Sequence, residues 1–285
     1  MIISDTSALV LNWTSKNVWK SKNAQDYLNG LDLSAADILH KKFDQEENYL
    51  QSQLLSNRKF FVRKYAVEFL EKCKKENIHA QVIILAAGID PLSVEIASLY
   101  PESKVFDVDK YFMSKKEKYL DNVCANIRFI ECDITNIEML KKILTEKGWN
   151  ENEKCILIME GITYYLYEND LRNILSFFAG RVSGLVCDFG IKAECVNKKD
   201  RFFGEVVCKK IIETVDIKFM NRFDPQYFLQ LLLQCGFKNP GRITMAQIQQ
   251  ERTGKSCPFE GEEPAWVALA WLPVKFLFAY NIIIC

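Results

Sequence analysis

Four residues that could bind a ligand follow or end short apolar runs of the chain. They are Gly88, Asp109, Asp133 and Glu160. The intervals between them are 21, 24 and 27 residues, and each is about the length of one helical crossover between two parallel strands. Because parallel strands present their carboxyl ends to the same crevice of a sheet, we expect these residues to lie together at a ligand-binding edge.

The three acids suit different parts of a nucleoside-containing cofactor. Asp109 ends the run VFDVD, where a carboxylate can accept hydrogen bonds from both hydroxyl groups of a ribose. Asp133 can accept from an adenine amine while the amide of Ile134 donates to a ring nitrogen, although Asp133 taken singly is also an ordinary helix N-cap. Glu160 ends the buried run CILIME, so its carboxylate needs a partner or a cationic ligand.

The turn after the first apolar run, VIILAA, favours a cofactor without phosphate. A dinucleotide fingerprint has three glycines that let backbone amides approach a pyrophosphate, whereas Gly88 stands alone and Pro91 has no amide hydrogen. S-adenosylmethionine has no phosphate and carries a positive sulfonium, which suits one glycine and several carboxylates. We therefore expect this cofactor rather than NAD or FAD. Gly88 by itself is equally consistent with the plain end of a strand.

The sequence predicts an α/β fold for the elements that position these residues. The predicted strands are Val82–Ala86, Val105–Asp109, Asn126–Glu131, Cys155–Glu160, Val182–Phe189, Arg242–Ala246 and Ala265–Leu272. The predicted helices of this region are Pro91–Tyr100, Ile137–Lys147, Glu168–Phe178 and Pro225–Cys235, with a loop rich in Gly, Pro and Glu before the last strand. A late antiparallel pair then completes a seven-stranded, mostly parallel sheet.

The chain divides by composition at about residue 78. Residues 1–78 hold little strand signal and four amphipathic patches, which predict a helical lid over the sheet edge; the patches are Ala8–Trp19, Ala24–Leu31, Ala35–Phe43 and Phe60–Cys73. Around the last patch, Arg58 and Arg63 are candidates to reach the cofactor. Residues 79–285 are predicted to form the core, with an insertion on the acceptor side near 192–224.

Composition excludes several classes of function. The 285 residues include 37 Lys and Arg and 37 Asp and Glu, so no net field attracts nucleic acid or an anionic membrane. Ten cysteines without a Cys-x-x-Cys pair and only two histidines predict reduced thiols, no metal site and a cytoplasmic location. The apolar tail Phe276–Ile284 is too short for a membrane span.

Five segments together resemble the leucine carboxyl methyltransferase family of class I S-adenosylmethionine-dependent O-methyltransferases. The segments are NRKFFVRKYAV, VIILAAGIDP, VFDVD, ECDI and MEGITYYL, and they agree with the family in order and spacing. The resemblance implies a Rossmann-like fold. It also implies that Arg63 pairs with the methionine carboxylate of the cofactor, that Gly88 lets the backbone approach it and that Glu160 lies near its methyl end. Ala86 departs from the family, which usually has a glycine there.

The resemblance implies methylation of a carboxylate, either of a small molecule or of a protein C-terminus. A carboxylate is ionised at neutral pH and needs no general base, which agrees with the absence of His40 and His79 from the predicted strand ends. Tyr165 is predicted to orient the acceptor and Arg201 to hold its negative charge. The alternatives are an O-methyltransferase for a small-molecule hydroxyl or phenol, with His40 as its base, and a non-catalytic cofactor-binding module.

Overall fold

The computed structural model describes residues 5–14, 16–120, 123–215, 220–261, 263 and 265–273. The apolar tail Phe276–Ile284 lies outside the described residues. Strands β1 to β7 form one sheet in the order β3-β2-β1-β4-β5-β7-β6, in which β7 runs antiparallel to both of its neighbours and the other pairs are parallel. This is the mostly parallel seven-stranded sheet predicted from the sequence.

The observed strands lie within two residues of the predicted bounds. They are β1 (Ala80–Leu85), β2 (Lys104–Asp109), β3 (Ile127–Glu131), β4 (Lys154–Met159), β5 (Gly184–Gly190), β6 (Gly241–Thr244) and β7 (Val267–Trp271). Every residue of the central strand β1 and of β5 is buried. Their sequences are mostly apolar, with Gln81 in β1 and Asp188 in β5 as exceptions, because both faces of a parallel sheet are covered by helices.

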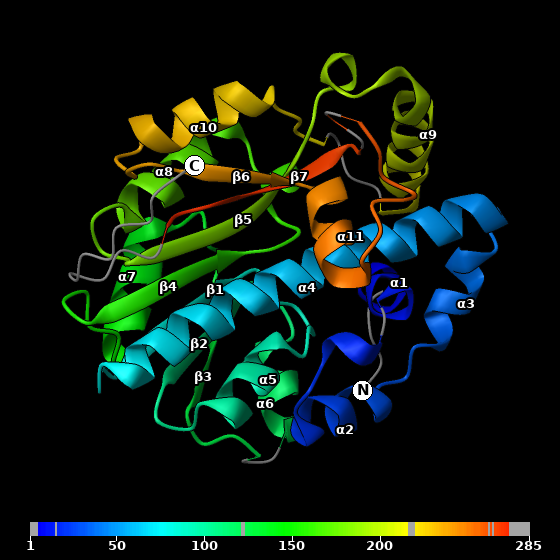
Figure 1. Cartoon of the computed structure of the whole chain (residues 1–285). Helices are drawn as coiled ribbons and strands as arrows, with labels where there is room; N and C mark the ends of the chain where they lie inside the picture. The colour runs from blue at the N-terminus through cyan, green and yellow to red at the C-terminus, as the bar shows by residue number, and fades with distance from the viewer. Residues whose placement is uncertain are drawn as a thin grey trace.

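Helices cover both faces of the sheet (Figure 1). The α-helices are α1 (Asp5–Trp13), α2 (Lys22–Asn29), α3 (Ser34–His40), α4 (Gln45–Lys75), α5 (Leu92–Leu99), α6 (Met113–Leu120), α7 (Ile137–Glu146), α8 (Glu168–Phe178), α9 (Lys198–Val215), α10 (Pro225–Gln234) and α11 (Met245–Thr253). Helix α4 crosses one face and packs against α5, β4 and β5, and α1, α2 and α3 lie beside it at one end of the sheet. Short 3₁₀ helices occupy Lys16–Val18, Thr163–Tyr165 and Ala193–Cys195.

Helix α4 is much longer than the predicted patch Phe60–Cys73. It begins after Asp44, whose side chain accepts a hydrogen bond from the amide of Glu47, while the Glu47 side chain accepts one from the amide of Asp44. This reciprocal capping box fixes the start of the helix at Gln45. The prediction began too late because it followed apolar periodicity alone and did not use the capping signal.

Helix α11 corrects the prediction of a loop after the sixth strand. The strand ends at Thr244, whose hydroxyl accepts a hydrogen bond from the amide of Gln247, while Oε1 of Gln247 accepts one from the amide of Thr244. Gly254 ends the helix in the left-handed conformation, at φ 77°. The segment is nearly uniform in polarity around the helix, so periodicity gave no sign of it.

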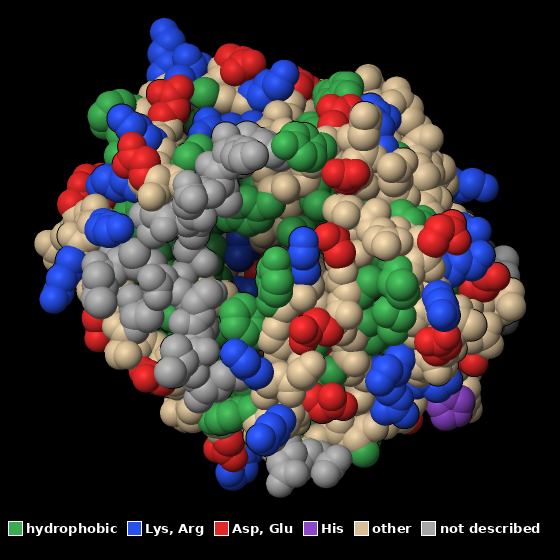
Figure 2. All heavy atoms as spheres, turned by 180° about the vertical axis from the view of Figure 1, so that it is seen from behind, with side chains coloured by type: hydrophobic (Ala, Val, Ile, Leu, Met, Phe, Trp, Pro, Cys, Tyr) green, Lys and Arg blue, Asp and Glu red, His purple; other side chains and the backbone are tan. Residues whose placement is uncertain are grey.

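The surface carries charges of both signs without a dominant field. On the face shown in Figure 2, Lys and Arg side chains alternate with Asp and Glu, and hydrophobic side chains border a hollow near the centre. Among the described residues, no helix is long and apolar enough to cross a membrane.

Candidate active site

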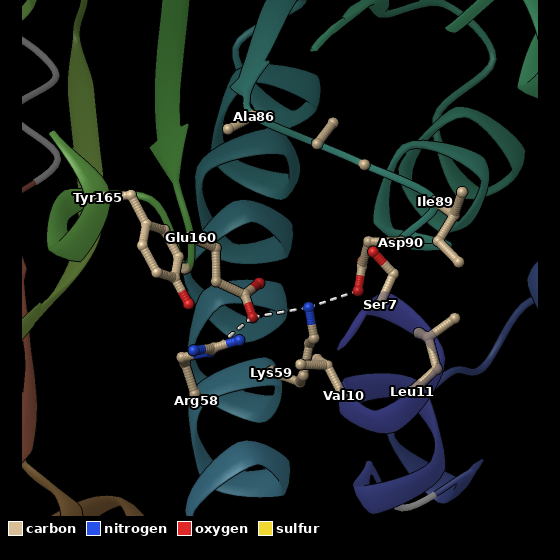
Figure 3. Close-up of a pocket in the computed structure, with 13 residues that line it drawn as sticks. Ser7, Val10, Leu11, Arg58, Lys59, Ala86, Ile89, Asp90, Glu160 and Tyr165 are labelled. Atoms are coloured by element: carbon tan, nitrogen blue, oxygen red, sulfur yellow. Dashed lines mark hydrogen bonds and ion pairs between the residues drawn. The ribbon is translucent and has the colours of Figure 1, made fainter. Parts of the chain in front are cut away.

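A cavity of about 180 Å³ lies where β1 and β4 end. Its wall is formed by the turn after β1, by the residues that follow β4, and by side chains of α4 and α1 (Figure 3). Helix α1 contributes Ser7, Val10 and Leu11. The cavity therefore sits at the crevice where sheets of this topology bind ligands, with an N-terminal helix over it.

The turn after β1 takes two residues through the left-handed region. Ala86 has φ 54° and Gly88 has φ 51°. No heavy atom lies within 4 Å of the place that a side chain on Gly88 would occupy, so the backbone faces open space there. The amide of Gly88 donates to Oδ2 of Asp109 at 2.8 Å, which joins the ends of β1 and β2.

The left-handed conformation of Ala86 predicts a stabilising substitution. The Cβ atom makes this conformation unfavourable for alanine, and glycine removes that strain. We expect Ala86→Gly to raise the free energy of unfolding by about 1 kcal/mol in chemical denaturation. Ala87 lines the same turn without a positive φ. Ala87→Gly should therefore lower the free energy of unfolding by about 0.4 to 1 kcal/mol. A similar loss of stability in both variants would show that the backbone of Ala86 is not strained.

Two cations of α4 and two acids of the sheet edge form a chain of ion pairs across the cavity (Figure 3). Arg58 Nε lies 2.9 Å from Glu160 Oε1, and Lys59 Nζ lies 2.7 Å from the same oxygen. Lys59 also pairs with Asp90. All four side chains are largely buried, so these charges are held in place by one another rather than by water.

A third acid, Asp188 near the end of β5, also binds Arg58 of this cluster. Its Oδ2 accepts hydrogen bonds from Arg58 Nη1 at 3.1 Å and from the hydroxyl of Tyr164 at 2.6 Å, and its Oδ1 accepts one from the amide of Gly161 at 2.7 Å. The side chain is fully buried. Asp188 thereby fixes both the orientation of Arg58 and the loop that carries Glu160.

The cluster has one carboxylate more than it has cations. Burial raises the pKa of Asp188 in spite of Arg58, and burial likewise raises the pKa of Asp90 although Lys59 opposes the shift. At Glu160 burial also acts to raise the pKa, but Lys59 and Arg58 outweigh it, so that the pKa is lowered and Glu160 is ionised. With all three acids ionised, the five groups leave one negative charge for a cationic ligand.

A second chamber, of about 120 Å³, adjoins the cavity and is mainly apolar. The two spaces share Val10, Arg58, Gly161 and Tyr165 in their walls. Side chains from α1, α4, α9 and the segment that leads into β7 complete the chamber. We call it the apolar chamber. Tyr165 thus stands between the two spaces, and burial raises the pKa of its hydroxyl, which remains a neutral donor.

The structure brings most of the predicted site residues to this edge of the sheet. Gly88, Glu160 and Tyr165 line the cavity. Asp109 ends β2 and Asp133 follows the end of the neighbouring β3, and the amide of Cys132 donates to the carbonyl of Asp109 at 2.9 Å. Asp109 lies beside the cavity rather than in its wall, held by the Gly88 amide. Ile134 follows Asp133 and is buried.

Asp133 has protein partners of its own. Its Oδ1 accepts hydrogen bonds from the amide and hydroxyl of Thr135, and its Oδ2 pairs with Lys110 at 2.9 Å. The hydrogen bonds from Thr135 and Lys110 lower the pKa of Asp133. Its carboxylate is therefore oriented by a local turn at the end of β3, which is compatible both with a turn-forming role and with contact to a ligand.

Two predicted arginines lie away from the cavity. Arg63 pairs through Nε with Glu95 of α5, whose carboxylate also accepts from the amides of Lys20 and Ser21. Arg201 donates through Nη2 to the carbonyls of Glu194 and Val196, at the start of α9. Neither guanidinium lines the cavity or the apolar chamber.

Sequence reasoning missed three charged groups of the cluster: Lys59, Asp90 and Asp188. Asp188 interrupts the apolar run LVCDFG of β5. A buried carboxylate requires a partner, and this rule, which was applied to Glu160, applies equally to Asp188. Asp90 stands just before α5, where its Oδ1 accepts a hydrogen bond from the amide of Leu92 at 2.9 Å. No feature of the sequence indicated that Lys59, next to Arg58, would enter the site.

Comparison with known proteins identifies the family. A sequence model of the leucine carboxyl methyltransferase family matches residues 6–179, and the chain belongs to this family. The protein is accordingly an S-adenosylmethionine-dependent methyltransferase with the class I, Rossmann-like fold. A search of curated proteins finds no match.

Solved structures agree with the fold. A DUF574 family protein from Streptomyces avermitilis superposes with a TM-score of 0.59 at 14% sequence identity, covering 93% of this chain and 95% of that chain. A protein from Thermobifida fusca, provisionally called a methyltransferase, gives a TM-score of 0.57 at 12% identity and covers 90% of this chain and 93% of that chain. The chain therefore shares its architecture with these proteins along nearly its whole length.

Proposed function

We propose that this protein transfers the methyl group of S-adenosylmethionine to a carboxylate and forms a methyl ester. The observation that supports this most directly is the apolar chamber, which adjoins the cofactor cavity and contains Arg222. In the described part of the chain no carboxylate forms an ion pair with Arg222. The Arg222 guanidinium interacts with the thiol of Cys208 and with no carboxylate of the described residues, which favours an anionic acceptor.

The residues at the strand ends fit the cofactor. S-adenosylmethionine has a net charge of about plus one at neutral pH, which the single excess negative charge of the cluster would balance. We propose that Asp109 binds the ribose hydroxyls, that Asp133 and the Ile134 amide bind adenine, and that the open space at Gly88 lets the cofactor approach the backbone. Glu160 would face the sulfonium.

Arg58 and Lys59 are better placed than Arg63 for the methionine end of the cofactor. Both line the cavity, whereas Arg63 lies outside its wall and pairs with Glu95. We therefore propose that Arg58 or Lys59 contacts the methionine carboxylate, in the role that the family resemblance suggested for Arg63. Helix α1 would cover the bound cofactor, because Ser7, Val10 and Leu11 form that wall of the cavity.

When bound, the cofactor supplies an electrophilic methyl group, and the protein has only to hold the acceptor oxygen in line and exclude water. A carboxylate needs no deprotonation. Among the described residues of the two walls there is no histidine, and the carboxylates present, Asp90 and Glu160, are paired with cations. Tyr165, with its raised pKa, is suited to donate a hydrogen bond to the acceptor rather than to remove a proton.

Tritiated methyl transfer tests the proposal. The protein is incubated with methyl-tritiated S-adenosylmethionine and a cell extract, with S-adenosylhomocysteine added to a parallel sample as the inhibition control. Mild alkali should then release volatile tritiated methanol from the product, because methyl esters hydrolyse and methyl ethers do not. Enzyme-dependent label that stays involatile after alkali would show a hydroxyl acceptor and reject carboxyl methylation.

A further inference from the structure

One buried amide in the apolar chamber has no hydrogen-bond partner. Gln51 of α4 is 3% exposed, and its Nε2 forms no hydrogen bond with the described residues. A buried donor without a partner destabilises the folded state. Buried polar groups are usually satisfied, so an unpaired donor in the wall of a chamber indicates an acceptor atom that arrives with a ligand.

Several polar side chains of the apolar chamber can donate hydrogen bonds. Arg58 and the hydroxyl of Tyr164 are already engaged by Asp188. The other polar groups of the wall include Gln51, Arg222 and the neutral hydroxyl of Tyr165. All three can donate hydrogen bonds to oxygens of an occupant.

The rest of the wall is apolar and comes from distant segments. It includes Trp13 of α1, Leu54 of α4, Ile211 of α9 and Trp266 before β7. A volume of about 120 Å³ is well below the roughly 300 to 1,000 Å³ of sites for drug-sized ligands. The space suits one ring or a short branched chain, which favours a compact small molecule over a length of polypeptide.

We propose that the apolar chamber binds the methyl acceptor, a compact carboxylic acid with an apolar body, and that Gln51 determines specificity by donating from Nε2 to an oxygen of this acceptor. The assignment of a carboxylate rests on the proposed function. The assignment of Gln51 rests on its own burial and unpaired donor. Gln51 is absent from the wall of the cofactor cavity, so it acts on the acceptor alone.

Binding of simple acids to the full chain tests this inference. Benzoate, phenylacetate and hexanoate are titrated in the presence of S-adenosylhomocysteine by calorimetry, with tryptophan fluorescence as a second readout because Trp13 and Trp266 line the chamber. Gln51→Met keeps the length of the side chain and removes the donor. The exposed Gln230 of α10, changed to Met, is the matched control.

We expect at least one acid to bind the wild type and the Gln230→Met variant alike, and Gln51→Met to bind it about tenfold more weakly. The variant should keep its affinity for S-adenosylhomocysteine and have an equal or higher melting temperature, because an unpaired buried donor is gone. If Gln51 were merely structural, the variant would have a lower melting temperature and an unaltered affinity for the acid, and that result would overturn the inference. Failure of all three acids and of the neutral amide phenylacetamide to bind the wild type would overturn it as well.

Phenylacetamide separates this inference from the proposed function. If the amide binds in a manner that depends on Gln51 while phenylacetate does not bind, the role of Gln51 is supported and carboxyl methylation is contradicted. If alkali-labile methyl esters form in the extract but the binding of every probe is independent of Gln51, carboxyl methylation is supported and the role of Gln51 is contradicted.

Discussion

Replacing Asp188 by alanine should lower the free energy of unfolding by about 3 to 5 kcal/mol, the range found when one partner of a buried ion pair is removed. The substitution leaves the Arg58 guanidinium buried with one carboxylate fewer. It also removes the acceptor of the Tyr164 hydroxyl and of the Gly161 amide. Urea denaturation near pH 7 measures the loss.

Two controls show whether the network is responsible. Asp188→Asn retains one carbonyl acceptor and should cost less than the alanine variant. Asp26 forms an ion pair with Lys22 in which both side chains are mostly exposed, so Asp26→Ala should change stability by only about 0.3 to 0.5 kcal/mol. A loss for Asp188→Ala no larger than that for Asp26→Ala would show that Asp188 does not hold the cluster together.

Replacing Asp109 by alanine should weaken the binding of S-adenosylhomocysteine by about 10- to 150-fold, the equivalent of one charge-assisted hydrogen bond of roughly 1.5 to 3 kcal/mol. The proposed contact is with the ribose hydroxyls. The carboxylate also accepts from the amides of Gly88 and Tyr111, so part of the loss can come from a less ordered turn. Calorimetry on folded protein measures the affinity.

The variants of Asp109 can separate the two causes. Asp109→Asn keeps an acceptor for a backbone amide and loses the charge, so an affinity between those of the wild type and the alanine variant supports direct contact with the cofactor. Glu102 is an exposed acid in the turn between α5 and β2, at the other end of these elements. Glu102→Ala should bind like the wild type, and equal binding by Asp109→Ala would reject the ribose assignment.

The alternation of apolar runs and amphipathic stretches determined the architecture. A strand buried on both faces, such as β1 or β4, reads as a continuous apolar run, and this signal is local. The acids at the ends of β2 and β3 could therefore be assigned to one edge before the structure was known. Helix α11 was missed because its sequence is not amphipathic, and only its caps mark it.

Which side chains turn toward the cofactor cavity was decided by the tertiary structure. Arg58 and Arg63 are both on α4, but five positions on a helix correspond to about 140° of rotation, so they point in different directions. The sequence contains both arginines and does not state which helix face meets the carboxyl edge of the sheet. Packing of α4 against β4 and β5 directs Arg58 and Lys59 into the cavity, while Arg63 meets α5.

The apolar chamber depends on contacts between segments that are far apart in the chain. Gln51, Ile211 and Trp266 belong to α4, α9 and the segment before β7, and no spacing rule relates them. Arg201 was predicted to hold the negative charge of the acceptor, yet it lies in the first turn of α9 and donates to backbone carbonyls. The sequence thus determined the sheet and the acids at its edge, because strand periodicity is local, whereas the acceptor side is formed only when distant helices pack together.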